Sequence, residues 1–209
     1  MPLYSGLPDF FKRINTKIQE DNLFKKYDIS LEHYIISTGM KTTILGSALG
    51  KEVNDIFASE FYEEEGVING IARSIGYSKK TEFLHLINKG GNTNPKIDVN
   101  SYLPKEYRRV PFEQMIYVGD GPTDVPCFAI LNHRGGKSIA VYNQDSEKAF
   151  KQTYQLQSEG RVFTFAPADY REGSHLSLVL EQVVKEMAQK IVDTTERELK
   201  RVIREAVRL

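Results

Sequence analysis

Short apolar runs alternate with segments of helical periodicity along this chain, and this alternation restricts the fold more than any other feature. Each run is five or six residues long and ends at a polar turn. The runs are HYIIS at 33–37, DIFAS at 55–59, QMIYVG at 114–119, SIAVY at 138–142 and RVFTFA at 161–166. Such runs are typical of strands that are buried in a parallel sheet. The alternation with helices predicts an α/β fold with a doubly wound, Rossmann-like parallel sheet.

The intervening segments predict the helices and one hairpin. Polar spacing predicts a hairpin over residues 61–71, and Ser78 is the expected N-cap of an amphipathic helix that continues to Asn88. Further helices are expected over residues 7–27, 41–50, 126–132, 146–157 and 174–209. The last one is expected to break near Asp193, because Thr195–Glu198 has capping-box spacing. We therefore expect an α/β core over residues 1–173 and a helical extension over 174–209.

Composition narrows the class of protein. The 28 basic and 28 acidic residues give a net charge of zero, so nucleic acid and anionic membranes are not expected partners. No apolar run approaches the ~20 residues that span a bilayer. The single cysteine, Cys127, excludes an internal disulfide and fits a reducing compartment. These features predict a cytoplasmic globular protein.

The segment MIYVGDGPTD at 115–124 carries the strongest chemical signal. An apolar strand runs into Gly-Asp-Gly, which places Asp120 at its carboxyl end, and Asp124 follows four residues later. The turn Ser37-Thr38-Gly39 ends another expected strand, and ligands of open α/β sheets bind at the carboxyl ends of strands. These residues can therefore share one site. The plain alternative is a tight turn in which Asp124 caps the next helix.

The order of these segments resembles the haloacid dehalogenase-like (HAD) superfamily of phosphohydrolases over most of residues 7–166. The resemblance implies that Ser37, with the N–H groups of Thr38 and Gly39, binds a phosphoryl group. It implies that Asp120 and Asp124 hold Mg²⁺, a hard cation that prefers carboxylate and water oxygens. The activity implied is hydrolysis of a small phosphorylated metabolite through an aspartyl-phosphate, which makes the family phosphatases.

The resemblance also implies a lysine near a helix start that neutralises the phosphate and the nucleophile. Lys80, in SKKTEFL, fits this position best. Lys79 and Lys89 are close in sequence and remain alternatives.

The family's nucleophile is absent from this sequence. It is an aspartate that follows the first, central strand in an apolar-run-D-x-D motif, and neither Asp9 nor Asp98 has such a strand before it. The opening LYSGLPDFFKRI resembles the family segment after the cap domain, so the chain looks truncated and is expected to be inert alone.

Loss of that strand has a structural consequence. It would leave a slot of two strand spacings, ~9–10 Å, between the strands that end at Ser37 and Asp120. We expect direct pairing of these strands, a strand from a partner or complementing fragment, or low stability.

A non-catalytic binding module derived from the same fold is the alternative function. It rests on the C-terminal helix, whose apolar residues share roughly one face: Leu176, Val179, Val183, Val184, Met187 and Ile191. This stripe either mediates self-association or, in the plainer interpretation, packs against the sheet. A dinucleotide-binding protein is disfavoured, because GDGPTD lacks the third glycine of that fingerprint.

Overall fold

A computed structural model describes residues 3–206, which divide into two compact units. The sheet unit contains residues 33–168, together with Leu3. The helical unit contains residues 4–32 and 169–206. The sequence placed a boundary near residue 173, close to the boundary at Asp169, but it assigned the N-terminal helices to the α/β core.

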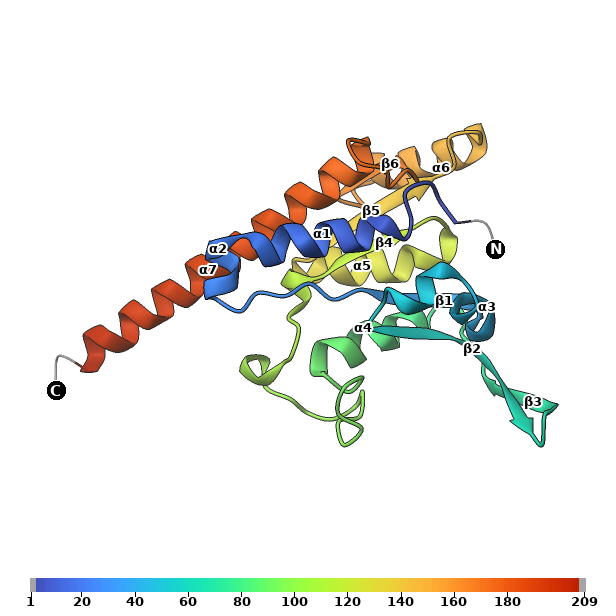
Figure 1. Cartoon of the computed structure of the whole chain (residues 1–209), viewed down its shortest axis with the longest axis horizontal. Helices are drawn as coiled ribbons and strands as arrows, with labels where there is room; N and C mark the ends of the chain where they lie inside the picture. The colour runs from blue at the N-terminus through green and yellow to red at the C-terminus, as the bar shows by residue number, and fades with distance from the viewer. Residues whose placement is uncertain (1–2, 207–209) are drawn as a thin grey trace. The chain divides into compact units, whose positions relative to one another are not determined.

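The helical unit contains three helices, α1 (Asp9–Glu20), α2 (Asn22–Lys26) and α7 (His175–Ala206) (Figure 1). The single helix expected over residues 7–27 is interrupted, because the Asp21 side chain accepts hydrogen bonds from the N–H groups of Leu23 and Phe24 and so caps α2. The break expected near Asp193 is wrong, since α7 continues through that residue. Residues 207–209 of the expected helix lie outside the described residues.

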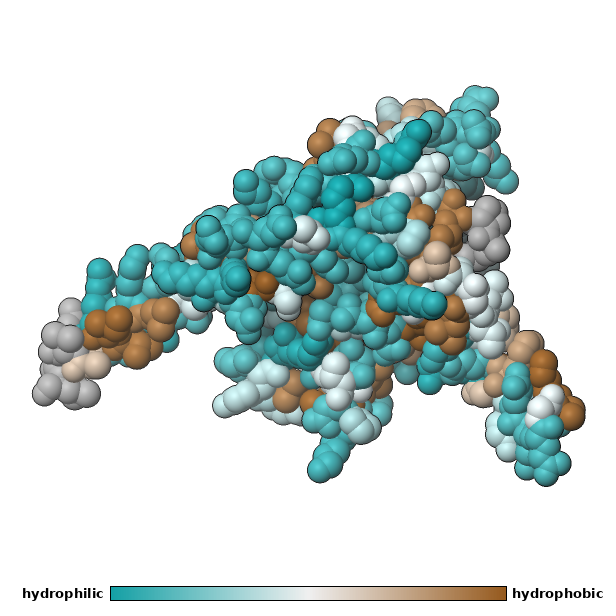
Figure 2. Space-filling view, in the orientation of Figure 1, coloured by the Kyte–Doolittle hydropathy of each residue, from teal (hydrophilic) through white to brown (hydrophobic). Residues whose placement is uncertain are grey.

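One face of α7 is buried, and α7 contacts α1 and α2. The buried residues of this face are Leu176, Leu180, Val183, Val184, Ala188 and Val192. Apolar residues Leu199, Val202 and Ile203, further along the helix, are exposed, and Figure 2 shows hydrophobic atoms over this part of α7. Of the six residues of the expected stripe, Leu176, Val183 and Val184 are buried, and Val179, Met187 and Ile191 are partly buried, so this part of α7 belongs to the intramolecular core.

The first sheet of the sheet unit has the order β1-β2-β3. It consists of β1 (Tyr34–Met40), β2 (Asp55–Glu64) and β3 (Val67–Arg73). β1 and β2 pair in parallel, and β2 and β3 form the expected antiparallel hairpin. The short helices α3 (Lys41–Leu45) and η1 (Ala48–Lys51) lie between β1 and β2 in the chain. The hairpin is solvent-exposed and carries both hydrophobic and charged side chains (Figure 2).

The second sheet has the order β4-β5-β6 and is entirely parallel. Its strands are β4 (Ile116–Gly119), β5 (Lys137–Tyr142) and β6 (Thr164–Pro167). Helices α5 (Val125–Arg134) and α6 (Glu147–Ser158) connect them, as the sequence predicts. Three single-turn helices complete the unit: η2 (Lys105–Tyr107), η3 (Phe112–Gln114) and η4 (Pro122–Asp124).

Helix α4 (Lys80–Lys89) joins the two sheets in sequence. The expected Ser78 cap is wrong: Lys79 is the N-cap residue, and no side chain caps this end. The other end follows the sequence, because Gly90 adopts a left-handed conformation (φ 85°) that favours glycine and closes the helix.

One hydrophobic core spans parts of both sheets. Phe57 of β2, Phe83 of α4, Tyr117 of β4 and Phe128 of α5 belong to the same buried cluster. The rings of Phe57 and Phe83 stack with centroids 4.7 Å apart. Helices α4 and α5 contact each other, and they contact β1 and β4–β5 respectively. These two helices therefore attach both sheets to one core.

The fold is mixed α/β, as predicted, but the single expected sheet is two three-stranded sheets. The strands that end near Ser37 and Asp120 stand at the ends of separate sheets, so their direct pairing, one of the three expected outcomes, is not found among the described strands. Within residues 3–206, no helix combines the length and apolar character needed to cross a membrane.

Candidate functional site

The loop after β4 is held in a tight conformation against its own carboxylate. β4 ends at Gly119, the single turn η4 follows at once, and α5 begins at Val125. A Cβ atom at Gly119 would lie 2.6 Å from Cβ of Asp124, whereas one at Gly121 would meet nothing within 4 Å. The Gly119 position therefore requires glycine so that Asp124 can fold back over the strand end.

Asp124 lies at the centre of a buried network, with 3% of its surface exposed. Its Oδ1 accepts hydrogen bonds from Nζ of Lys80 (2.6 Å) and from the hydroxyl of Tyr117 (2.6 Å). Its Oδ2 accepts from the backbone N–H groups of Asp120 (3.1 Å) and Gly121 (3.2 Å). All four partners are donors, so the site is built for a carboxylate at this position.

Lys80 reaches this network from the first turn of α4 and is 6% exposed. Its Nζ also donates to the Thr123 hydroxyl at 3.0 Å. The structure thus distinguishes the three candidate lysines. Lys79 is exposed, and Lys89 donates to the carbonyl groups of Val99 and Ser101 near the other end of the helix. Of the three, Lys80 is the one that the fold brings to the Gly-Asp-Gly loop.

Two residues of the network were missed by sequence reasoning, Tyr117 and Thr123, and the neighbouring Cys127 is a buried side chain, which is the interpretation that the sequence favours for this residue. Burial, followed by the adjacent Asp124 carboxylate, raises the pKa of the Tyr117 hydroxyl, so it remains a donor. Burial also raises the pKa of the Cys127 thiol to about 11, which argues against a reactive thiolate. A tyrosine inside a buried strand was the available signal, because its hydroxyl needs a partner.

The expected end of the first strand at Ser37 is wrong: β1 continues through Ser37, Thr38 and Gly39 to Met40, and its pairing with β2 becomes irregular between Ile36 and Met40. The Ser37 hydroxyl accepts a hydrogen bond from the N–H of Gly39 at 3.0 Å. Thr38 and Gly39 are exposed. In this conformation the Gly39 N–H donates to the Ser37 oxygen. The Ser37 hydroxyl can in turn donate a hydrogen bond to a phosphate oxygen.

Hydrogen bonds place the two predicted regions at the same end of the sheet unit. The Ser59 hydroxyl of β2 donates to the carbonyl of Thr38 (3.1 Å) and accepts from the N–H of Ile75 (3.2 Å). Five residues after Ile75, Lys80 joins Asp124. The segment that leads into α4 therefore runs from the carboxyl end of β1, which Ser59 in the middle of β2 faces, to the carboxyl end of β4.

The predicted Mg²⁺ ligands differ in their surroundings. Asp120 is exposed, whereas both oxygens of Asp124 accept the hydrogen bonds described above. Among residues 3–206 there is no group of three His, Cys, Asp or Glu side chains placed to hold a metal ion. Mg²⁺ in phosphate sites keeps several waters and uses one or two carboxylates together with the phosphate. Asp120 fits one ligand of such a shared site, and the described residues do not form a complete Mg²⁺ site by themselves.

A pocket of about 210 Å³ adjoins the Gly-Asp-Gly loop. Asp120, Gly121 and Pro122 line it on one side, and Gln152 and Gln155 of α6 line it on another. The loop is thus open to a small ligand.

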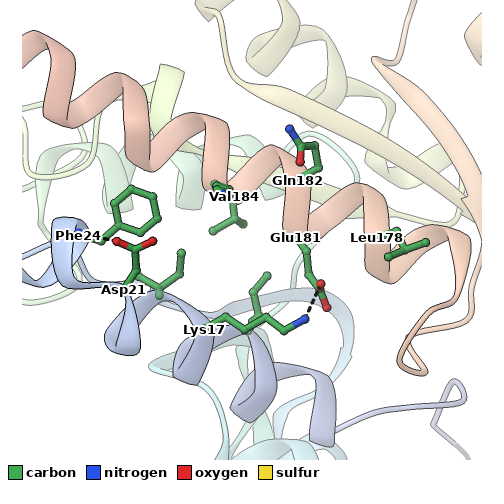
Figure 3. A pocket seen from close by; sticks show the side chains of 10 residues that line it. Lys17, Asp21, Phe24, Leu178, Glu181, Gln182 and Val184 are labelled. Atoms are coloured by element: carbon green, nitrogen blue, oxygen red, sulfur yellow. Dashed lines mark hydrogen bonds and ion pairs between the residues drawn. The ribbon is translucent and has the colours of Figure 1, made fainter.

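A larger pocket, of about 330 Å³, belongs to the helical unit. Figure 3 shows side chains of α1, α2 and α7 around it, including the ion pair between Lys17 and Glu181 (2.7 Å). Asp21 also lines it, but this side chain is the cap of α2. The charged groups named here are engaged in structural interactions, so we place the candidate site at the Gly-Asp-Gly loop. Of its residues, Asp120 lines the smaller pocket, whereas Lys80, Asp124 and Ser37 do not.

Comparison with known proteins gives one informative match. A protein of Borreliella burgdorferi named uncharacterized protein is 30% identical over 189 residues, which cover 82% of this chain and 61% of the relative. No family model matches the chain, and no solved structure matches it. The chain therefore spans 61% of the length of that relative.

Proposed function

We propose that this chain is the metal- and phosphate-binding part of a HAD-like phosphohydrolase, built on a doubly wound α/β core. The observation that carries the proposal is the buried Lys80–Asp124 pair beside the exposed Asp120 at the carboxyl end of a parallel strand. A buried ammonium group fixed by two oxygen-bearing neighbours, Asp124 and Thr123, is costly to assemble for stability alone. Its position next to an open acidic loop favours a role in ligand binding.

Each residue of the site has its own role in binding the phosphate and the metal ion. Lys80 supplies positive charge that offsets a phosphoryl group, and Asp124 and Thr123 hold its ammonium group in place. Asp120 supplies one carboxylate to a Mg²⁺ ion that the phosphate also binds. Ser37 donates its hydroxyl to a phosphate oxygen. The substrate class is a small phosphorylated metabolite.

The described residues include no carboxylate in the position of the family's nucleophile, so we propose that the chain alone binds phosphate without turning over an ester. Isothermal titration of the full chain with MgCl₂ in the presence of inorganic phosphate tests the binding. Binding is expected to weaken at least tenfold in Asp120→Asn and to stay unchanged in Asp98→Asn, which removes the same charge from an exposed loop. Absence of phosphate-dependent Mg²⁺ binding would overturn the proposal.

Hydrolysis of p-nitrophenyl phosphate tests the second half of the proposal. No turnover above buffer is expected. Turnover that disappears in Asp120→Asn would show that the chain is a complete enzyme and that its nucleophile has another origin.

A non-catalytic interaction module is the second candidate. The exposed residues Leu199, Val202 and Ile203 follow the spacing i, i+3, i+4 and continue the buried stripe of α7. This arrangement suits helical self-association. A sedimentation mass that stays monomeric over a hundredfold concentration range would count against it.

A further inference from the structure

The outer part of the β2–β3 hairpin, residues 61–73, has no core beneath it, and we call it the hairpin arm. Every residue of the arm is exposed, whereas Ile56, Phe57 and Ala58, in the first half of β2, are buried. In Figure 1 the arm extends away from the other strands of the sheet unit. A ribbon of two strands is marginally stable in water, and three or more strands are usually needed. The arm is therefore expected to gain stability from additional strands.

Large apolar side chains cover the arm. Those that are between 43% and 70% exposed are Phe61, Tyr62, Val67, Ile68 and Ile71. Phe61 and Tyr62 are adjacent in β2, so their rings lie on opposite faces of the ribbon. Figure 2 shows hydrophobic atoms on the surface of the arm. Soluble monomers rarely expose large contiguous apolar patches, so this arrangement indicates an interaction surface.

The outer edge of β3 is open to another strand. β3 pairs with β2 and stands at the end of its sheet, so part of its N–H and C=O groups face an edge along which no described strand runs. Edge strands of soluble proteins are usually protected by lysine, proline or inward-pointing charges. β3 carries no proline, and its one charged residue is Arg73 at the end of the strand. The edge from Val67 to Ala72 is thus a template for strand pairing.

The charges of the arm indicate which strand fits this edge. Residues 63–65 are all glutamate and form an acidic tip, and Arg73 lies at the base of the arm. Within its own chain Arg73 approaches Glu60 at 3.9 Å, whereas Lys41 binds the same carboxylate at 2.7 Å. The side chain of Arg73 is 44% exposed. Its guanidinium group is therefore accessible to a second carboxylate.

An antiparallel second copy of the arm complements both the apolar and the charged groups. In the symmetric register centred on Asn69, Val67 lies opposite the partner's Ile71, and Glu65 lies opposite the partner's Arg73. Twofold symmetry forms each of these contacts twice. A parallel arrangement would instead bring the two acidic tips together, and like charges on facing strands are destabilising.

We propose that two copies of this chain associate through the outer edges of their β3 strands, which pair antiparallel and join the two arms into one four-stranded sheet. The committed occupant of the edge is a second copy, because the acidic tip and Arg73 complement each other in that pairing. The inference goes beyond the proposed function and uses none of the residues of the phosphate site.

Sedimentation equilibrium of the full chain, without phosphate or Mg²⁺, tests the association. Between about 1 µM and about 1 mM the mean mass is expected to rise from 23.9 kDa toward twice that value. Ile71→Asp places a charge on the pairing edge and is expected to weaken association at least tenfold. Tyr102→Asp introduces the same charge at a 91% exposed residue outside the arm and is the unchanged control. A mass that stays at 23.9 kDa throughout would overturn the proposal.

Leu199→Asp distinguishes the arm from the exposed end of α7. Association is expected to be unchanged in this variant and weakened in Ile71→Asp. The opposite result would assign self-association to α7 and would overturn the proposal. Both substitutions are at exposed residues, so the unfolding midpoint is expected to stay unchanged and to show that each variant folds.

Charge reversal tests the antiparallel register. Glu65→Arg is expected to weaken association at least threefold, because it places two positive charges opposite each other, although it makes the acidic tip less negative. Glu65→Arg combined with Arg73→Glu is expected to restore association. Association that strengthens in Glu65→Arg, or that stays weak in the double variant, would overturn the proposed pairing. None of these readouts depends on phosphate or Mg²⁺, so failure here is distinguishable from failure of the proposed function.

Discussion

Replacing Asp124 by asparagine isolates the ion pair with Lys80, because the two side chains have nearly the same shape. The four groups around the Asp124 carboxylate are all donors. An amide in either orientation therefore directs its own NH₂ at two donors and loses the hydrogen bonds on that side. The substitution also leaves the Lys80 ammonium, 6% exposed, without its opposite charge.

The size of the effect follows from burial. Removing one partner of a buried ion pair costs about 3–5 kcal/mol. With a urea m-value of about 2 kcal/mol/M, the unfolding midpoint of the sheet unit is expected to fall by about 1.5–2.5 M. Asp120→Asn removes an equal charge four residues earlier from an exposed position, and its effect is expected to stay within about 0.5 kcal/mol.

Urea unfolding followed by circular dichroism measures the loss, and amide exchange at Ile139–Val141 assigns it to the sheet unit. Lys80→Met combined with Asp124→Leu removes both charges and is expected to be more stable than Asp124→Asn alone by at least about 1 kcal/mol. A loss below about 1 kcal/mol in Asp124→Asn, or no recovery in the double variant, would refute the reasoning that this pair is a desolvated and mutually dependent unit.

Three further predictions concern the loop, pH and α7. Gly119→Ala is expected to lower the free energy of unfolding by more than about 2 kcal/mol, because its Cβ would lie 2.6 Å from Cβ of Asp124. Gly121→Ala is the control, because a Cβ at Gly121 meets nothing within 4 Å. Equal unfolding midpoints of the two variants in chemical denaturation would contradict this expectation. Burial lowers the pKa of His33 from 6.5 to about 4. As the pH falls, the unfolded chain therefore binds a proton at His33 before the folded chain does. The free energy of unfolding is expected to fall by up to about 3 kcal/mol between about pH 6.5 and pH 4. His33→Gln should flatten that slope, and an unchanged slope would assign it to other groups. Leu199→Asp should leave the unfolding midpoint within about 0.5 kcal/mol, because this side chain is exposed; a large loss would show that it is covered.

The positions of the strands were largely predictable from the sequence. Short apolar runs identified β1, β2, β4, β5 and β6 within a few residues, because period and burial are local signals. Helix ends were less predictable, since Asp21 interrupts the first helix through one side-chain cap and Ser78 does not cap α4. The division into two sheets was not predicted, because strand order depends on contacts that are distant in sequence.

The sequence predicted which charged residues lie at the Gly-Asp-Gly loop, and it did not predict the hydrogen bonds that they form. The sequence identified Lys80, Asp120 and Asp124, and it treated both acids as metal ligands. The structure directs Asp124 to Lys80 and leaves Asp120 on the surface of the loop. No spacing rule reports this difference, because it depends on how α4 returns to the end of β4. Tyr117 was read as a strand residue, and its hydroxyl became part of the site only through burial.

The central claim is that the carboxyl ends of β1 and β4 form one phosphate-binding edge around Lys80. A nitrogen-15 NMR titration of the full chain with inorganic phosphate and MgCl₂ tests it most directly, because it reports where binding occurs. The account predicts shifts at the amides of Gly39, Gly119, Asp120 and Gly121 and at the start of α4. Absence of shifts, or shifts confined to the pocket lined by Lys17 and Glu181 in the helical unit, would contradict it.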